Sequence, residues 1–263
     1  MFNKKKLFPV CCLLLILAIP IAAASDLTGE LKIAASVKKH LISGQAITLN
    51  ADHQFLAITD NQTPTAPKGS ILILHGAQSN PNAPQLIRPL RTRLPTLGWI
   101  TLSIQLPILS PDPSMDTYQP WIKKTLPRIE VALNHLKMNN PDKPVIVIAH
   151  SLGAVSALSY LSQLTAKSVC DAFVLISMPP TETKQTDSVS ALSKIDIPVL
   201  DIYASQDWDN VKRSASSRKL TLKKKNKLNR QIEITGANHF YNGLDDELAL
   251  SIYGWLTYIT KKP

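Results

Sequence analysis

The sequence alternates short apolar runs with longer segments of helical periodicity. Runs with the character of buried strands occupy residues 71–74, 99–104, 145–148, 173–176, 199–203 and 232–234. Helical patterns occupy residues 86–94, 118–138, 152–164 and 244–260. Near-continuous apolar strands that are separated by helices indicate a mostly parallel sheet with helices on both of its faces. The pattern therefore predicts an α/β fold.

A helical pattern precedes this alternation. It places Ile33, Val37 and Leu41 on one face and runs to Gly44, a residue type suited to cap the C-terminus of a helix. We therefore expect residues 25–46 to form an N-terminal helical segment that packs on the main body of the fold.

The remaining length fits a single domain. An early strand is expected at residues 55–59, followed by a polar turn over 60–68. A chain of 263 residues, 44% of them hydrophobic, can bury one large core. We expect one domain over residues 25–263.

The first 24 residues have the three parts of a secretory signal. Lysines at positions 4–6 form a basic start, residues 10–19 form an apolar stretch, and three alanines at 22–24 form a small-residue cleavage site. This pattern predicts a signal peptide over residues 1–24 and a periplasmic or secreted mature protein. The alternative is an uncleaved membrane anchor, since residues 7–24 approach the length that spans a bilayer. The prolines and alanines of this segment favour cleavage.

Cysteine usage is consistent with export without a disulfide. Cys11 and Cys12 lie inside the predicted signal, and neither follows the small residue that a lipoprotein cleavage site needs. Cys170 would then be the remaining cysteine, which excludes an intramolecular disulfide. Because it precedes the apolar run, we expect it to be a thiol packed in the core.

Much of the net charge of +10 is concentrated in one segment, residues 212–230, which contains nine Lys and Arg and no Asp or Glu. Such a segment is a candidate for contact with an anionic membrane, a glycan or an anionic substrate, with Lys223, Lys224 and Lys225 as its densest part. The alternative is a solvated helix and loop without a partner. Nucleic acid is not expected, because the segment has no aromatic residue.

A serine stands where a buried strand meets a helical pattern. The run 145–148 ends at Ala149 and His150, and Ser151 precedes the helical segment. The pattern is close to G-x-S-x-G, with Ala149 in place of the first glycine. That position needs a small residue because the strand and the helix pack closely there, and alanine meets the requirement. The pattern predicts that Ser151 is a nucleophile at the tip of a sharp turn.

A serine hydroxyl needs a base, and the base needs an acid partner that orients it. Asp207 ends an apolar strand that runs into a short polar turn, which places its carboxylate at the same edge of the sheet as the serine. Asp201 is less suitable because it lies within the strand, and Asp209 lies just past the turn. We expect Asp207 to be the acid.

His239 is the candidate base, because it follows the last predicted strand and completes the chain order Ser, Asp, His. His40 and His135 lie on predicted helices, and His53 precedes the first clear strand. His150 adjoins the serine, but the turn itself would aim its ring away from the serine Oγ.

Donors for a developing oxyanion are expected on two backbone segments. The loop over residues 74–78 follows the first core strand and contains His75 and Gly76. The N–H of Ala77 in this loop would join the N–H of Leu152 at the helix start and stabilise a tetrahedral intermediate.

Two intervals control access to this edge of the sheet. Residues 106–117 are rich in proline and are expected to form a loop over the C-terminal ends of the strands. Residues 178–194 lie between two predicted strands, where an inserted cap domain could cover the site. They are too few for a separate cap domain and are expected to contain one helical turn at 188–192. We therefore expect a site without a large cap domain.

Together these motifs resemble the α/β-hydrolase superfamily. The resemblance depends on His75 and Gly76 and on residues 149–153, 204–207 and 236–239. Residues 69–76, 87–91 and 97–107 are similar to an uncharacterised family of exported bacterial α/β-hydrolase-like proteins. The resemblance covers residues 55–256 and implies a sheet of about eight strands and hydrolase chemistry, without a defined substrate.

The sequence therefore predicts an exported serine hydrolase, esterase-like or lipase-like, that forms an acyl-enzyme on a small ester or lipid-like substrate. No cofactor or metal is expected, because the sequence lacks H-E-x-x-H, paired-cysteine, Walker and G-x-G-x-x-G motifs. The alternative is a non-catalytic binding or scaffold protein of the cell envelope that keeps the fold and uses its basic segment.

Overall fold

The computed structural model describes residues 26–63, 65–108, 115–163, 169–183 and 186–260. The predicted signal peptide lies outside these residues. So does part of the proline-rich loop that was expected over 106–117.

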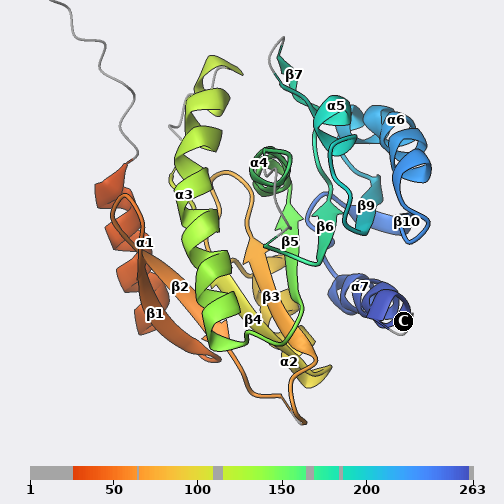
Figure 1. Ribbon diagram of the computed structural model, residues 1–263. Helices are drawn as coiled ribbons and strands as arrows, with labels where there is room; N and C mark the ends of the chain where they lie inside the picture. The colour runs from red at the N-terminus through yellow and green to blue at the C-terminus, as the bar shows by residue number, and fades with distance from the viewer. Residues whose placement is uncertain (1–25, 64, 109–114, 164–168, 184–185, 261–263) are drawn as a thin grey trace, which may run out of the picture.

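An eight-stranded sheet forms the centre of the molecule (Figure 1). Its spatial order is β1-β2-β4-β3-β5-β6-β9-β10. β1 pairs antiparallel with β2 and β2 antiparallel with β4, whereas all other neighbours are parallel. The predicted mostly parallel sheet is confirmed. The strands are β1 (Gln45–Asn50), β2 (Gln54–Asp60), β3 (Gly69–Leu74), β4 (Trp99–Ile104), β5 (Val145–His150), β6 (Ala172–Ile176), β9 (Val199–Gln206) and β10 (Arg230–Asn238).

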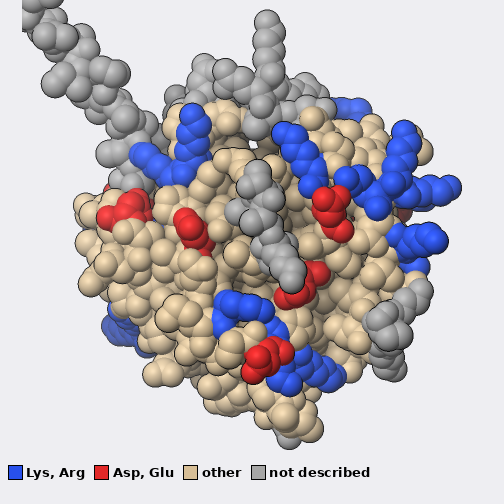
Figure 2. Space-filling view, in the orientation of Figure 1, with Lys and Arg blue, Asp and Glu red and all other residues tan. Residues whose placement is uncertain are grey.

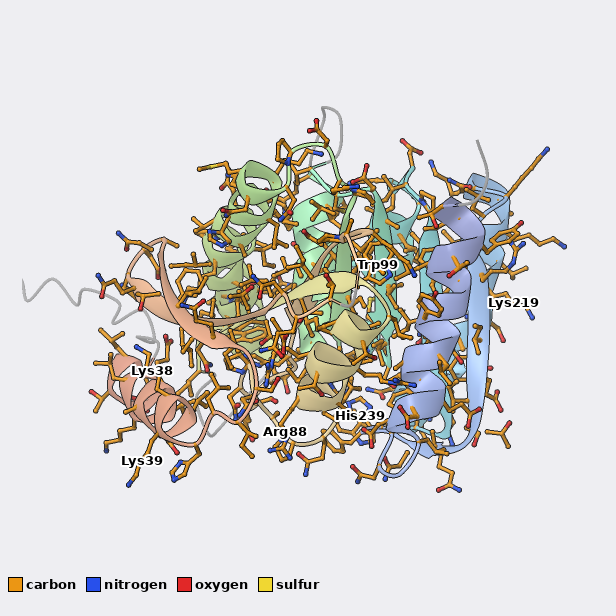
Figure 3. All side chains as sticks on the ribbon, turned by 90° about the horizontal axis from the view of Figure 1, so that it is seen from below. Lys38, Lys39, Arg88, Trp99, Lys219 and His239 are labelled. Atoms are coloured by element: carbon orange, nitrogen blue, oxygen red, sulfur yellow. The ribbon has the colours of Figure 1, made fainter. Side chains whose placement is uncertain are left out.

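Helices cover both faces of this sheet, as the apolar strands predicted. In β5, alternate side chains contribute to two different cores. Val145 and Val147 pack with α3 (Met115–Asn139) and α4 (Leu152–Leu161). Ile146 and Ile148 pack on the other face with α2 (Ile87–Thr96) and α7 (Asp245–Thr260). Figure 3 shows Trp99 of β4 in the interior, where its side chain is fully buried in the second core.

The N-terminal segment differs from the prediction. Helix α1 (Leu27–Lys39) ends well before Gly44, and residues 45–50 form the edge strand β1. Gly44 does not cap the helix. It has φ +81° in the turn between α1 and β1, where a Cβ would lie 2.6 Å from Nη1 of Arg91 and 2.8 Å from the carbonyl oxygen of Thr59. The glycine is needed for this turn, and it was misread as the end of a helix.

The interval between β6 and β9 carries small elements only. A two-stranded hairpin, β7 (Glu182–Thr183) and β8 (Thr186–Asp187), precedes the single helical turn α5 (Ser188–Leu192). The helical turn lies where it was predicted, and the hairpin was not expected. Among the described residues, no separate cap domain covers the C-terminal ends of the parallel strands.

One long helix was not among those predicted. Helix α6 (Asp209–Lys225) follows β9 and packs against it. Its buried residues are Val211, Ala215, Arg218 and Leu222, so an arginine interrupts an otherwise apolar face. The spacing is helical, but the many Lys and Ser residues concealed it. Cys170, just before β6, is buried as expected.

Candidate active site

Ser151 occupies the turn between strand β5 and helix α4. Its backbone has φ 53° and ψ −126°, a conformation that non-glycine residues rarely adopt. The turn is held at both ends: the Ser151 N–H donates to the carbonyl oxygen of Ile176 at 2.9 Å, and its carbonyl oxygen accepts from the N–H of Ala154 at 2.9 Å. The neighbouring sheet and the first helical turn therefore fix the serine in a strained, outward conformation.

Close packing around this turn explains its small residues. A Cβ on Gly153 would lie 2.3 Å from the carbonyl oxygen of His75, so the helix start rests directly on the loop after β3. Ala149 is completely buried in the core with α3 and α4, and its methyl group is accommodated there. Glycine is therefore required at position 153 and not at position 149.

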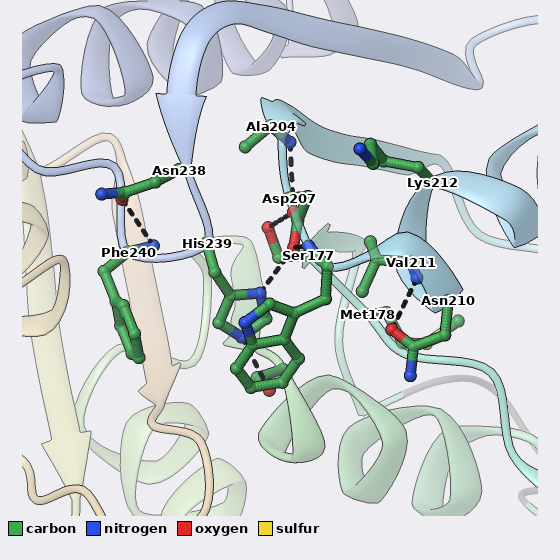
Figure 4. A network of polar contacts seen from close by, with 12 residues as sticks. Ser177, Met178, Ala204, Asp207, Asn210, Val211, Lys212, Asn238, His239 and Phe240 are labelled. Atoms are coloured by element: carbon green, nitrogen blue, oxygen red, sulfur yellow. Dashed lines mark hydrogen bonds and ion pairs between the residues drawn. The ribbon is translucent and has the colours of Figure 1, made fainter.

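The structure brings the three predicted residues into one hydrogen-bonded line. His239 Nε2 lies 3.2 Å from Ser151 Oγ, and His239 Nδ1 lies 2.6 Å from Oδ1 of Asp207 (Figure 4). Both His239 and Asp207 are buried, and Ser151 is 6% exposed. With Nδ1 donating to the carboxylate, Nε2 is free to accept a proton from the serine hydroxyl. This is the arrangement that nucleophilic catalysis by a serine requires.

Four donors surround the Asp207 carboxylate. Oδ1 accepts from His239 and from the N–H of Trp208 at 2.8 Å, while Oδ2 accepts from Ser177 Oγ and from the N–H of Ala204 at 3.2 Å. Burial by itself raises the pKa of Asp207, but the hydrogen bonds from His239 and Ser177 outweigh burial, so the pKa lies below its ordinary value. Asp207 is therefore ionised at neutral pH and stabilises a positive charge on the imidazole.

Ser177 and Tyr241 support this carboxylate, and sequence reasoning missed both. The Tyr241 hydroxyl lies 3.0 Å from Ser177 Oγ, and since Ser177 donates to Asp207, the tyrosine donates to the serine. Both residues are buried and have positive φ, 50° for Ser177 and 55° for Tyr241. Ser177 directly follows the buried strand β6, which is the signal that could have placed it at this edge.

His150 fixes the backbone of His239. Its Nε2 donates to the carbonyl oxygen of His239 at 2.9 Å. Burial lowers the pKa of His150 to about 3, so the ring is neutral at physiological pH. The prediction excluded His150 as the base, and its hydrogen bond gives it a different role: it holds the loop that carries His239.

His75 fixes the loop that was expected to form the oxyanion hole. Its Nδ1 donates to the carbonyl oxygen of Gly76 at 2.6 Å, and its Nε2 accepts from the N–H of Leu106 at 3.0 Å. Burial lowers the pKa of His75 to about 4, which keeps it in the neutral form that can accept at Nε2. The ring thereby orients the peptide that precedes Ala77.

The two predicted oxyanion donors lie beside Ser151. Ala77 and Leu152 line the same pocket as Ser151, a cavity of about 590 Å³. Leu152 is the first residue of α4, where N–H groups have no acceptor within the helix. Within the described part of the chain, neither amide donates to another residue. Both amides therefore stay candidate donors for an oxyanion hole.

A family model of proteins of unknown function, DUF3530, matches residues 20–125 and 119–258. The chain belongs to the DUF3530 family. A comparison with curated protein sequences finds no match.

Solved structures identify the fold. A protein of unknown function from Agrobacterium tumefaciens, described as a candidate α/β-hydrolase, is 20% identical with a TM-score of 0.64 over 81% of this chain and 95% of its own. A serine hydrolase without a lid from Xanthomonas campestris is 13% identical, with a TM-score of 0.65 over 84% and 97%. An esterase from Pyrococcus furiosus is 16% identical, with a TM-score of 0.66 over 84% and 95%. At these identities the similarity shows the fold alone, which is that of the α/β-hydrolases, as the motifs implied.

The rejected acid candidates have other roles or partners. Asp201 is fully buried within β9 and forms an ion pair with Arg218, with Oδ2 2.8 Å from Nε. Asp209 is exposed at the start of α6 and lies 3.3 Å from Nζ of Lys212. Neither carboxylate contacts His239.

The basic segment is less uniform than its sequence indicated. Arg218 is buried against Asp201, so it belongs to the core and not to a surface patch. Lys225 Nζ lies 2.8 Å from a carboxylate oxygen of Asp196. Lys223 and Lys224 are exposed, and Figure 2 shows a group of basic side chains on the surface over α6. None of these lysines lines the pocket of Ser151.

Two further kinds of site were sought in the described residues. No group of three or more His, Cys, Asp or Glu side chains there is arranged to hold a metal ion. None of the helices in those residues is both long and apolar enough to cross a membrane.

Proposed function

We propose that this chain is a serine hydrolase that cleaves carboxylic esters through an acyl-enzyme. The observation that supports the proposal most strongly is the hydrogen-bonded line from Ser151 through His239 to Asp207 at the base of an open pocket. A non-catalytic scaffold has no physical need for this line, nor for the strained backbone that presents the serine.

The first half of the reaction forms the acyl-enzyme. Ser151 Oγ attacks the acyl carbon of the ester while His239 Nε2 takes the hydroxyl proton. The carbonyl oxygen becomes an oxyanion, which the N–H groups of Ala77 and Leu152 stabilise. The bond to the alcohol oxygen then breaks, and His239 returns the proton to that oxygen, so that the alcohol leaves neutral.

The second half repeats these steps with water. His239 removes a proton from a water molecule whose oxygen attacks the acyl carbon, and the collapse of the second intermediate returns the proton to Ser151 Oγ. Asp207 remains ionised throughout and stabilises the imidazolium in both halves. The carboxylic acid leaves, and the free serine is restored.

A fluorophosphonate probe tests this proposal directly, since it reacts only with an activated serine. We expect labelling of the wild-type protein and none of the Ser151→Ala variant. Ser159→Ala, in the same helix and outside the pocket, is the matched control and should label like the wild type. Absence of labelling in a folded wild-type protein would contradict the proposal and favour the scaffold alternative.

Replacing the other two residues tests their roles. The Asp207→Asn and His239→Gln variants should each hydrolyse 4-nitrophenyl acetate on the order of 10³-fold more slowly or worse, because the base loses its orientation or is absent. Activity within tenfold of the wild type in either variant would contradict the assigned mechanism.

We also propose that the protein is exported. The basic, apolar and small-residue parts of residues 1–24 support this proposal. Cell fractionation and N-terminal sequencing of the recovered protein test it: a mature chain that begins near residue 25 is expected, and a cytoplasmic chain with an intact N-terminus would contradict it.

A further inference from the structure

Uncharged side chains line the pocket around Ser151 wherever the structure describes its wall. Among the described residues that line it, none is Asp, Glu, Lys or Arg, although the chain has a net charge of +10. Among the described lining residues, the titratable side chains are those of Tyr118, His150 and His239. A charged group that entered this pocket would lose hydration without gaining an ion-pair partner, which costs several kcal/mol. The lining therefore selects against a charged substrate.

The same pocket contains four side-chain amides among its described lining residues. They come from three separate parts of the fold, namely the loop after β3, helix α3 and the first turn of α6. Asn210 accepts the N–H of Val211 at 2.8 Å through its Oδ1, which leaves its NH₂ group as a donor. Each glutamine can both donate and accept. The amides are those of Gln78, Gln85, Gln119 and Asn210, of which Gln119 already has an interaction within the protein.

A long acyl chain would not need these amides. It would bury them without providing hydrogen bonds, and each unsatisfied polar group lowers the affinity. A ligand that carries several hydroxyl groups would satisfy them instead. The amides therefore favour a substrate rich in hydroxyl groups over a fatty acyl ester.

Exposed aromatic rings complete the lining. Trp208 is 51% exposed and Phe240 is 44% exposed, and both line the pocket. Figure 4 shows Phe240 and Asn210 on opposite sides of His239. Aromatic rings provide flat apolar surfaces, and amides provide hydrogen bonds beside them. A sugar ring has C–H groups for such surfaces and hydroxyl groups for such amides, and a cavity of about 590 Å³ has room for it.

We propose that the ester cleaved at this site carries an uncharged, hydroxyl-rich group, and that its substrates are acylated sugars. This inference rests on the proposed function, since it names the substrate class of the same site. The amides bind the hydroxyl groups, the exposed rings contact the C–H faces, and the acyl carbon lies at Ser151 Oγ. The reaction releases the free sugar and the carboxylic acid by the two steps given above.

Two acetates with the same six-membered frame test the proposal. Methyl 6-O-acetylglucoside and cyclohexylmethyl acetate are both acetate esters of a primary alcohol attached to a six-membered ring. Only the glucoside carries free hydroxyl groups. We expect kcat/KM of the full-length protein to be at least tenfold higher for the sugar ester. A succinate mono-4-nitrophenyl ester should also be cleaved at least tenfold more slowly than 4-nitrophenyl butyrate, because its carboxylate is charged.

Variants connect this preference to the amides. Gln85→Leu and Asn210→Leu should each reduce the ratio of the two kcat/KM values by about fivefold, the effect of one hydrogen bond. Gln62→Leu is the matched control. This exposed glutamine follows β2, which ends beside the start of β4 and therefore at the end of the sheet away from Ser151. Its replacement should leave the ratio unchanged.

The outcomes separate the two proposals. Equal kcat/KM values for the two acetates, or a preference for cyclohexylmethyl acetate, would overturn the sugar assignment and leave the ester hydrolase intact. A ratio that stays the same in Gln85→Leu and Asn210→Leu would also overturn the assignment. Failure to hydrolyse either acetate or 4-nitrophenyl acetate would overturn the proposed function and the sugar assignment with it.

Discussion

The indole ring of Trp208 stacks on the imidazole ring of His239, with 3.5 Å between the ring centroids and 11° between the ring planes. Trp208 directly follows Asp207, whose carboxylate accepts a hydrogen bond from Nδ1 of the same histidine. Two consecutive residues therefore hold His239, one through a hydrogen bond and the other through its ring face.

This stacking leads to a prediction about catalysis. In the proposed reaction His239 becomes a cation when it takes the proton of Ser151, and a cation over an aromatic face gains about 1 kcal/mol. Trp208→Leu should therefore lower kcat/KM for 4-nitrophenyl acetate about fivefold, whereas Trp208→Phe, which keeps a ring face, should lose less. The midpoint of thermal unfolding should change little in both variants, because the side chain is half-exposed. Equal losses in Trp208→Leu and Trp208→Phe would contradict this explanation.

The three catalytic candidates could be predicted from the sequence because each follows an apolar strand. In a parallel sheet the C-terminal ends of the strands meet at one edge, so Ser151, Asp207 and His239 had to lie close together once the strands were recognised. The chain order Ser, Asp, His then excluded most other aspartates and histidines as the acid and the base. The supports of the triad were harder to predict, since the roles of Ser177 and His150 depend on side-chain directions that periodicity does not contain.

Other features were concealed by residue type. Strand β1 (Gln45–Asn50) lies at the edge of the sheet and is mostly exposed, so it lacks the apolar run that identified the other strands. The burial of Arg218 could not be predicted from its basic neighbours, because it depends on an ion pair with Asp201 on another element. In both places a contact distant in sequence outweighed the local pattern.

The buried histidines predict how stability depends on pH. Burial lowers the pKa of His75 to about 4 and that of His150 to about 3, below the ordinary value of 6.5. Between these values the unfolded chain binds protons that the folded chain does not, so the free energy of unfolding falls as the pH is lowered through this window. Between pH 7 and pH 5, each of these two histidines should lower the free energy of unfolding by about 2 kcal/mol. The pKa of Asp207 is also lowered, but this carboxylate acts in the same direction only below about pH 4.

Urea unfolding at pH 7 and pH 5 measures this dependence. The His75→Gln variant removes one titrating group, so its free energy of unfolding should fall by about 2 kcal/mol less than that of the wild type between the two pH values. The same fall in the variant and the wild type would show that His75 does not titrate as its burial implies.

Two glycines in helices should respond in opposite directions to the same substitution. Gly254 lies exposed in α7, and a Cβ there would meet no atom within 4 Å, so Gly254→Ala should raise the free energy of unfolding by about 0.5–1 kcal/mol. Gly153 lies in α4 with the carbonyl oxygen of His75 2.3 Å from the position of a Cβ. Despite the same gain in helix propensity, Gly153→Ala should lower the free energy of unfolding by about 1–3 kcal/mol and should also reduce labelling of Ser151 by a fluorophosphonate. If Gly153→Ala were stabilising, the helix start could not rest on the loop as described.

The exposed lysines of α6 predict binding to an anionic surface. Lys219, Lys223 and Lys224 are exposed, and among the described residues none of them has an ion pair within 4 Å. Figure 3 shows Lys219 at the opposite side of the molecule from Lys38 and Lys39, so the two basic groups can be tested separately. Each lysine near an anionic bilayer contributes about 1 kcal/mol at low ionic strength.

We therefore expect the protein to sediment with vesicles that contain phosphatidylglycerol and not with vesicles of phosphatidylcholine alone, and we expect added salt to release it. Replacing both Lys223 and Lys224 by glutamine should weaken this binding by about tenfold or more, because two of the charges nearest the bilayer are lost. The matched variant, with glutamine at Lys38 and Lys39 of α1, has the same net charge and should bind like the wild type. If both double variants bound equally, the attraction would come from the overall charge of the protein, and α6 would be a solvated helix without a partner.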